Sequence, residues 1–433
     1  MGIKDEENDK KRDDEISKSA ECCIVCETAE PDEWIQCDVC DKWSHMGCLS
    51  VSRLELRDFV EFYCQQCEPT HGPSVRRDSK RRNKLRLNYA ALNNGIVQIE
   101  NTHSHVQVFK SGMFEAAHFP EVSELSGVYE TPVIARSENS SNLNMKMPSG
   151  LTPRKVAQII GEDYPVPVMD VVTQNNLPGW TAGKWADYFE TPEKNRDRVL
   201  NVISLEFSGT KLEGLVQRPA YVDKLDLVDK IWPVSETKKR PKVKYYCLMG
   251  TAGCFTDFHV DFGGTSVFYH VVSGQKSFAF IEPTSDNLLI YEKWCKSEAQ
   301  ATTLLSDLVD KCVVVNLFPG DTMIIPSGWI HAVYTPKDAV ILGGNFLTLE
   351  NLASQLRIEA LEYRTNVPQR YTFPNFRKTV WYAAKYIAQN SDIYPGQPTI
   401  ELSKLLKGYL FEREGCSLPK DIDTQEILSF LKV

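Results

Sequence analysis

The chain has 433 residues, a hydrophobic content of 42% and a formal net charge of -9. This length exceeds what one ordinary core supports, so we expect two or more domains. The acidic balance excludes a protein that is coated with nucleic acid over its whole surface, but it leaves room for a local basic patch. The sequence contains no run of about 18 apolar residues, so we expect no membrane span.

Residues 1 to 21 are polar, mixed in charge and without aromatic side chains, which predicts a disordered tail. Eight of the 13 cysteines then fall between Cys22 and Cys67. The chain starts without an apolar signal core, and such clustering in a long chain of this kind favours metal ligands over disulfides.

The candidate ligands of this module come in pairs with two residues between the members. The pairs are Cys23 and Cys26, Cys37 and Cys40, His45 and Cys48, and Cys64 and Cys67. This spacing lets a tight turn aim both side chains at one ion, and four pairs supply two closed tetrahedral zinc sites. Cys22 is an alternative to Cys23 as the first ligand.

Four cysteines, one histidine and three cysteines in this order resemble the PHD finger, over residues 22 to 68. The resemblance implies that alternate pairs share an ion: Cys23, Cys26, His45 and Cys48 at one zinc, and Cys37, Cys40, Cys64 and Cys67 at the other. It also implies that Trp34 and Trp43 form walls of an aromatic cage for trimethylated lysine four of histone H3, by cation–π attraction. The alternative is that both indoles only shield the zinc ions.

Residues 69 to 197 begin with a basic stretch, "HGPSVRRDSKRRNKLRLNYA". Residues 76 to 86 are candidates for contacts to DNA phosphates or for nuclear import, and a solvated linker is the alternative. Further on, "VQIENTHSHVQVF" and "PVPVMDVV" predict strands, so we assign this region to the linker and the N-terminal part of the catalytic region.

Residues 198 to 350 contain short β-rich runs separated by the turn signals "SGQ", "PGD" and "PSG", which predicts a compact barrel or jelly roll. Residues 351 to 433 change to helical periodicity, in "NLASQLRIEALEY" and "FRKTVWYAAKYIAQ". These segments predict a C-terminal helical domain that caps the barrel.

The barrel carries a candidate metal site. His259 and Asp261 lie two residues apart in "FHVDF", and His331 follows 70 residues after Asp261 in "PSGWIHAV". Two histidines and one carboxylate form the facial triad of non-haem iron(II) oxygenases, which leaves coordination positions open. Residues i and i+2 of a strand point to the same face, so the first two ligands can converge on one ion. The alternative is a strand whose His and Asp are satisfied by hydrogen bonds.

The phrases "NVISLEFS", "TDFHVDFGGTSVFYHVVSGQKSFAFIEPT", "IPSGWIHAV" and "GGNFL" resemble the Jumonji-C domain. Together with the finger, they resemble the PHD-finger and Jumonji-C family of histone lysine demethylases, of the lysine demethylase 7 type. The resemblance implies that 2-oxoglutarate is bound by Thr256, Tyr269, Lys276 and Asn201. It places Tyr246 and Asn345 near the methylated amine. For Lys276, a solvated strand lysine is the alternative.

The expected fold class is α+β and multidomain: a two-zinc PHD finger, a double-stranded β-helix (jelly-roll) core and a helical cap. The resemblance implies a nuclear, iron(II)- and 2-oxoglutarate-dependent dioxygenase, with two structural zinc ions, that acts on the histone H3 tail in nucleosomes. Its expected targets are mono- and dimethylated lysines nine and twenty-seven. The alternatives are a methyl-histone reader without turnover and a protein hydroxylase that uses the same iron site.

Overall fold

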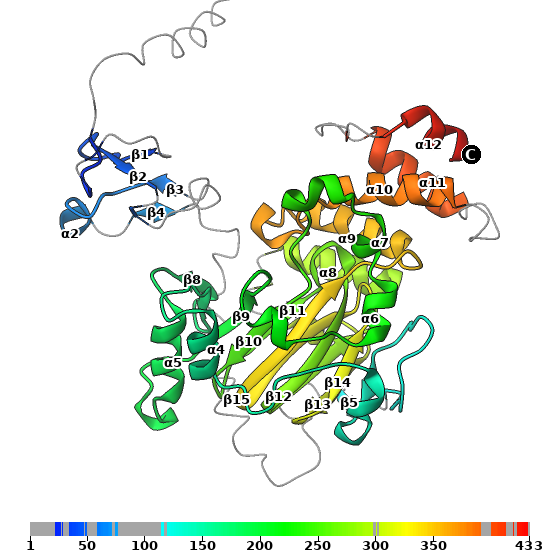
Figure 1. Ribbon diagram of the computed structural model, residues 1–433, viewed down its shortest axis with the longest axis horizontal. Helices are drawn as coiled ribbons and strands as arrows, with labels where there is room; N and C mark the ends of the chain where they lie inside the picture. The colour runs from blue at the N-terminus through cyan, green and yellow to red at the C-terminus, as the bar shows by residue number, and fades with distance from the viewer. Residues whose placement is uncertain are drawn as a thin grey trace, which may run out of the picture. The chain divides into compact units, whose positions relative to one another are not determined.

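The structure is a computed structural model that describes residues 22–26, 28, 34–46, 48–49, 59–71, 74–76, 114–116, 119–297, 300, 303–390, 400–412, 419 and 422–431. The chain divides into two compact units, Met1–Arg82 and Asn83–Val433, and each has its own core (Figure 1). Across the described ranges, no helix combines the length and the apolar character needed to cross a membrane.

The regular elements of the first unit are short in the part that the structure describes. Its described residues form two antiparallel strand pairs and one short helix: β1 (Trp34–Gln36) with β2 (Trp43–His45), β3 (Phe59–Glu61) with β4 (Val75–Arg76), and α2 (Glu68–His71). Among the residues described there, its buried cluster contains three apolar side chains, Ile35, Met46 and Phe62, beside the thiols of Cys37 and Cys64. A core of this size cannot offset the entropy of ordering the chain, so metal binding has to contribute.

The second unit is built on one eleven-stranded sheet that folds over on itself. The main path runs β5-β13-β12-β15-β10-β9-β7-β8, and β11, β14 and β6 pair at its sides. The strands are β5 (Phe114–Ala116), β6 (Val133–Ala135), β7 (Val168–Asp170), β8 (Asn175–Leu177), β9 (Leu200–Glu206), β10 (Tyr246–Gly250), β11 (Phe255–His259), β12 (Ser266–Ile281), β13 (Cys312–Leu317), β14 (Thr322–Ile325) and β15 (Ile330–Phe346).

Strands β12 and β15 run through both layers of the jelly roll. The first part of β12 pairs with β14 and the last part with β13, while β15 pairs first with β11 and then with β10. The prediction of a chain-reversing turn at "SGQ" is wrong: the strand continues through Gly274, at φ +80°, with register shifts on both sides. A bulge inserts extra residues without ending the pairing, which is why the turn residues stay inside a strand.

In the part of the chain that the structure describes, helices pack against the sheet and against one another. They are α4 (Pro153–Ile160), α5 (Ala182–Glu190), α6 (Ala220–Leu225), α7 (Leu227–Ile231), α8 (Ser285–Lys296), α9 (Leu352–Arg364), α10 (Phe376–Gln389), α11 (Ile400–Lys407) and α12 (Thr424–Phe430). The side chains of Thr152 and Thr181 cap α4 and α5 by accepting from backbone N–H groups. Helices α9 to α12 gather at the C-terminal end of the unit and share one apolar cluster with α7 (Figure 1).

These elements confirm the expected fold class and both predicted C-terminal helices. The segment "PVPVMDVV" contains β7, as predicted. The segment "VQIENTHSHVQVF" and residues 77 to 86 of the basic stretch lie outside the described residues.

Candidate metal centres and cosubstrate pocket

The first unit brings the eight predicted zinc ligands into two groups. One group contains Cys23, Cys26, His45 and Cys48, and the other contains Cys37, Cys40, Cys64 and Cys67, with the candidate ligand atoms of each group within 4.8 Å of one another. Cys22 lies outside both groups. The alternating pairs are therefore brought together in space, as in a cross-braced finger.

The close packing of the thiols in these groups shifts their pKa values. Hydrogen bonds from Thr28 lower the pKa of Cys26 to about 6, whereas the Cys26 thiol raises the pKa of its neighbour Cys48 to about 11. Ionisation of one thiol therefore opposes ionisation of the next, because thiolates at this distance repel one another. A tetrahedral divalent cation removes this conflict by stabilising every thiolate at once, so the donor set fits zinc.

The two candidate cage tryptophans project from the same face of the β1–β2 ribbon. Trp34 is in register with His45, and Trp43 lies two residues before His45 on the same strand. The Trp34 ring packs on the His45 ring with centroids 4.0 Å apart. Trp34 therefore covers the candidate zinc ligand His45, and Trp43 extends the same aromatic face.

The second unit brings His259, Asp261 and His331 together, with ligand atoms within 4.8 Å. His259 ends β11, and Asp261 follows in extended backbone, so the two residues keep the spacing expected of a strand although β11 stops between them. His331 is the second residue of β15 and is in register with His259. The imidazole centroids are 4.3 Å apart, and His331 Nε2 lies 3.7 Å from Asp261 Oδ2.

Both imidazoles are oriented by backbone carbonyls. His259 Nδ1 lies 2.8 Å from the Asp257 oxygen, and His331 Nδ1 lies 3.0 Å from the Trp329 oxygen. A carbonyl only accepts, so Nδ1 carries the proton and Nε2 offers its lone pair to the centre of the group. Burial lowers the pKa of His331 to about 4 and raises that of Asp261, which favours neutral imidazole as a ligand and leaves the carboxylate in need of a cation.

Lys276, on β12, is buried at 3% exposure. Its Nζ donates to Thr335 Oγ1 at 2.8 Å, and within the described ranges no carboxylate pairs with it. Burial lowers its pKa to about 8. A buried ammonium without a counter-ion is costly, so this position fits a ligand that brings a carboxylate.

Two further buried polar atoms have unsatisfied hydrogen-bonding capacity. One lies near Lys276, and the other lies on the same strand as Lys276. Asn201 Oδ1, on β9, and the Tyr269 hydroxyl, on β12, have no hydrogen-bond partner among the described residues. A side chain at Gly250 would place its Cβ 3.0 Å from Lys276 Nζ, 3.1 Å from Asn201 Oδ1 and 3.2 Å from Thr335 Oγ1. Glycine at this point therefore keeps open a polar cradle, which fits one end of a dicarboxylate. The described side chains thus suit 2-oxoglutarate beside an iron(II) triad.

The other predicted pocket residues occupy the same region of the barrel. Thr256 lies on β11 three residues before His259, and Tyr246 is half-buried at the start of β10. Asn345 Nδ2 lies 2.8 Å from Thr265 Oγ1 and 3.4 Å from Asp261 Oδ1, so this amide contacts a candidate ligand directly.

Sequence reasoning missed Thr335, Gly250 and Glu362. Glu362, on α9, is buried, and its Oε1 accepts from the Gly263 N–H at 2.8 Å in the turn that follows Asp261. Burial raises the pKa of Glu362 to about 8, and the charges of Glu359 and Asp261 add to this. The contact between Gly263 and Glu362 joins residues 99 positions apart, so no local sequence motif could predict it.

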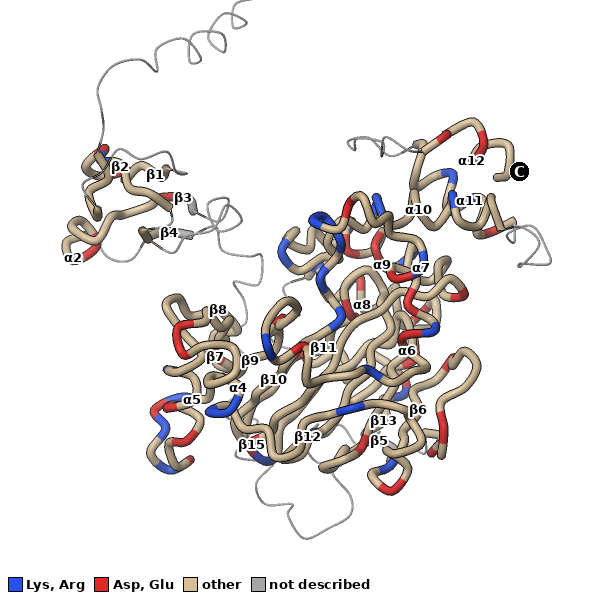
Figure 2. Tube along the Cα trace, in the orientation of Figure 1, with Lys and Arg blue, Asp and Glu red and all other residues tan. Residues whose placement is uncertain are grey.

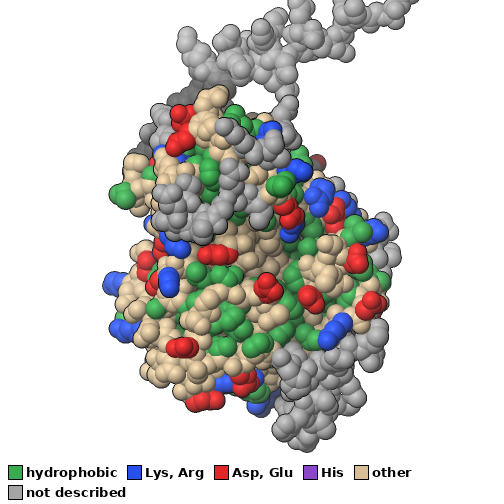
Figure 3. All heavy atoms as spheres, turned by 90° about the vertical axis from the view of Figure 1, so that its right-hand side faces the viewer, with side chains coloured by type: hydrophobic (Ala, Val, Ile, Leu, Met, Phe, Trp, Pro, Cys, Tyr) green, Lys and Arg blue, Asp and Glu red, His purple; other side chains and the backbone are tan. Residues whose placement is uncertain are grey.

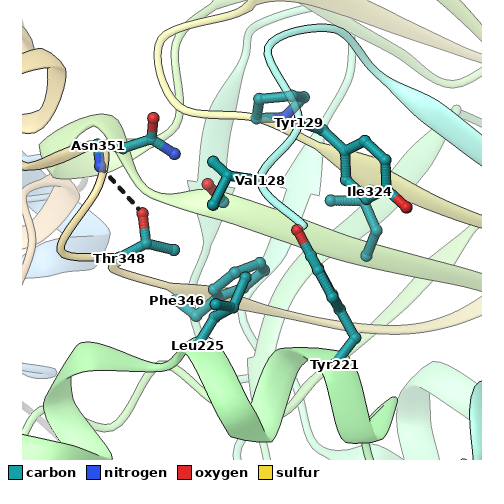
Figure 4. A pocket seen from close by; sticks show the side chains of 10 residues that line it. Val128, Tyr129, Tyr221, Leu225, Ile324, Phe346, Thr348 and Asn351 are labelled. Carbon is teal, nitrogen blue, oxygen red and sulfur yellow. Dashed lines mark hydrogen bonds between the residues drawn. The ribbon is translucent and has the colours of Figure 1, made fainter. Parts of the chain in front are cut away.

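The small pocket drawn in Figure 4 does not belong to the metal site. Its walls include Tyr129, Tyr221 and Phe346. Successive strand residues face opposite sides, so Phe346 points away from the side on which Asn345 meets Asp261. The pocket and Asp261 therefore lie on opposite faces of strand β15.

The fold and these groups define a two-zinc finger joined to an iron- and 2-oxoglutarate-type jelly roll. Family models match at residues 23–67 (PHD-finger), 246–346 (JmjC domain, hydroxylase) and 350–392 (Jumonji helical domain). The JmjC domain-containing histone demethylation protein 1 of Yarrowia lipolytica is 40% identical over 390 residues, 86% of this chain and 76% of that protein. The histone lysine demethylase PHF8 of Danio rerio is 38% identical, over 82% of this chain and 35% of that protein. The lysine-specific demethylase 2A of Xenopus tropicalis is 48% identical, over 56% of this chain and 22% of that protein.

The chain belongs to the PHD-finger and JmjC histone demethylase family. It is a JmjC-type, 2-oxoglutarate-dependent dioxygenase, and its family places it in chromatin regulation with methylated histones as partners. The JmjC domain implies dependence on iron(II) and 2-oxoglutarate, and the PHD finger implies zinc.

Proposed function

We propose that His259, Asp261 and His331 hold iron(II), that Thr256, Tyr269, Lys276 and Asn201 bind 2-oxoglutarate, and that Tyr246 and Asn345 line the methyl-lysine pocket. One observation carries this proposal: the barrel that contains the His-Asp-His group also contains the buried Lys276, which pairs with no carboxylate among the described residues. We also propose two structural zinc ions in the finger, held by the two four-ligand groups.

Iron(II) and 2-oxoglutarate, when bound, would supply oxygen activation: one atom of the oxygen molecule would be used to convert 2-oxoglutarate to succinate and carbon dioxide, and the other would be inserted into a C–H bond of the substrate N-methyl group. The hydroxylated methyl carbon then leaves as formaldehyde, and the nitrogen keeps a hydrogen. The chain's own residues position these partners. Lys276 pairs with the distal carboxylate, the backbone carbonyls of Asp257 and Trp329 fix the imidazoles, and Asn345 orients Asp261.

For the substrate, we propose mono- and dimethylated lysines nine and twenty-seven of histone H3, presented in the nucleosome. The finger would read trimethylated lysine four through Trp34 and Trp43, and the basic residues 76 to 86 would contact DNA. Nuclear localisation follows from these partners. We assign the tail to residues 1–21, the finger to 22–68, the linker and N-terminal catalytic part to 69–197, the Jumonji-C domain to 198–350 and the helical domain to 351–433.

Two other functions use the same parts. A reader would bind methylated peptides without turnover, and a protein hydroxylase would leave a stable product because its hydroxyl is on a carbon away from nitrogen. The three polar groups around Gly250 and the triad favour turnover over a reader. The finger favours a histone substrate over other proteins.

The test is mass spectrometry of a panel of histone H3 peptides that covers each methylated lysine, with iron(II), 2-oxoglutarate and a formaldehyde assay. We expect loss of methyl groups from the lysine nine and twenty-seven peptides, and no turnover by the Asp261→Ala variant, which still binds through its finger. Stable gain of one oxygen without formaldehyde would favour the hydroxylase. Binding without any mass change would favour the reader, and turnover at other lysines would replace the proposed targets.

A further inference from the structure

A basic segment leads into the strand that carries Tyr246. From Arg218 to Lys244 the sequence has eight Lys or Arg and four Asp or Glu, in a chain whose net charge is -9. The segment spans α6, α7 and η7 (Val234–Lys239) and ends at the start of β10. Figure 2 shows its lysines and arginines as blue stretches beside α7 and down toward the barrel.

All four acidic side chains of this segment are already paired with cations. The fully buried Arg218 binds Asp223 at 2.7 Å, Asp226 at 2.8 Å and Asp229 at 3.2 Å. Asp229 also pairs with Arg240 and Lys244, and Glu236 pairs with Lys378 on α10.

Five lysines of this segment stay outside this network. Lys224 and Lys230 lie in α6 and α7, and the other three lie close together in the sequence before β10. Lys238, Lys239 and Lys242 are exposed, and among the residues that the structure describes none of them forms an ion pair. Three positive charges are therefore presented to solvent without compensation.

The backbone that carries these lysines is fixed by side chains. Trp232 Nε1 donates to the Glu236 oxygen at 3.0 Å, and Asn375 Nδ2 donates to the Lys239 oxygen at 2.8 Å. The Tyr246 hydroxyl contacts the Lys242 oxygen at 3.4 Å. This last contact links the lysines to a residue of the proposed methyl-lysine pocket.

We propose that Lys238, Lys239 and Lys242 bind the phosphates of nucleosomal DNA next to the histone tail that enters the barrel. The proposal rests on the proposed function. A histone tail is itself rich in lysine and arginine and is repelled by such a surface, whereas a phosphate backbone is attracted to it whatever its sequence. The contact would position the enzyme on nucleosomes and leave catalysis on short peptides unchanged.

The test compares the parent, a Lys238→Ser, Lys239→Ser, Lys242→Ser triple variant, and a control triple, Lys194→Ser, Lys293→Ser and Lys337→Ser. The control removes the same charge from exposed lysines elsewhere in the same unit. For each protein, binding to a free DNA duplex and to nucleosomes is measured across a salt series, together with turnover of a methylated peptide and of nucleosomes.

We expect the first triple variant alone to lose duplex and nucleosome affinity and to reduce the salt slope of log K by about 2.7, the contribution of three phosphate contacts. Its peptide turnover should match that of the parent. Unchanged duplex binding, an equal loss in the control triple, or a loss of peptide turnover would overturn the proposal. The duplex measurement needs no activity, so failure of the proposed function is seen separately, as a parent that turns over no peptide.

Discussion

The finger and the barrel hold their ligand groups by opposite means. In the finger the ligands are the core: the thiols of Cys37 and Cys64 are as buried as Ile35 beside them. In the barrel the ligands lie at strand ends, and two large apolar clusters pack around them without needing a metal. A site whose ligands build the fold is closed, whereas a site carried by an independent fold can keep open positions for chemistry.

The largest expected effect is that of zinc removal. A strong chelator at neutral pH should unfold the finger and leave the barrel intact, because zinc supplies about 10–16 kcal/mol to domains of this kind. Hydrogen exchange resolved by segment is the measurement, with amides of β1 and β2 compared with those of β12 and β15. If the amides of β1 and β2 stay protected after complete loss of zinc, the finger does not depend on its metal for folding.

A second prediction concerns the cosubstrate. Lys276→Ala should raise the KM for 2-oxoglutarate roughly 100-fold, since removing one partner of a buried ion pair costs about 3 kcal/mol. The barrel should still fold, because the variant also removes a buried charge for which the described residues provide no counter-ion. Steady-state kinetics and a thermal melt check both points, and an unchanged KM would exclude Lys276 from the pocket.

Much of this contrast is readable from sequence, since it depends on local spacing. Pairs with two intervening residues define the finger, and His259 with Asp261 defines one edge of the triad. The helices α9 and α10 follow from their apolar periodicity. What the sequence hides depends on contacts between distant segments. The "SGQ" bulge forms because β15 pairs along the whole of β12, and Thr335 meets Lys276 across 59 residues.

The third prediction concerns such a distant contact. Helix α9 touches both ligand-bearing turns: Glu362 accepts from Gly263 after Asp261, and Ser354 meets Ser327 before His331. Glu362→Leu removes the acceptor and should weaken metal binding about 10- to 100-fold, the usual cost of losing an outer support of a metal ligand.

Its matched variant is Glu362→Gln, which keeps an acceptor oxygen of the same shape and should bind metal like the parent. Calorimetric titration with manganese(II), a redox-stable substitute for iron(II), measures this without turnover. If both variants bind metal equally well, α9 is only a cover for the barrel and does not position Asp261.

The smallest expected effect is a pH dependence confined to the barrel. Burial holds the pKa of free Lys276 at about 8, below its ordinary value of 10.5, so the lysine is charged below pH 8 and becomes neutral above it. A bound dicarboxylate stabilises the charged form and raises this pKa again. The KM for 2-oxoglutarate should therefore stay level below pH 8 and rise up to about tenfold per pH unit above it, as for any ligand whose binding takes up one proton. Lys276→Met should show a high KM without this slope. A slope that persists in Lys276→Met would assign the titration to another group and leave the buried ammonium without a role in cosubstrate binding.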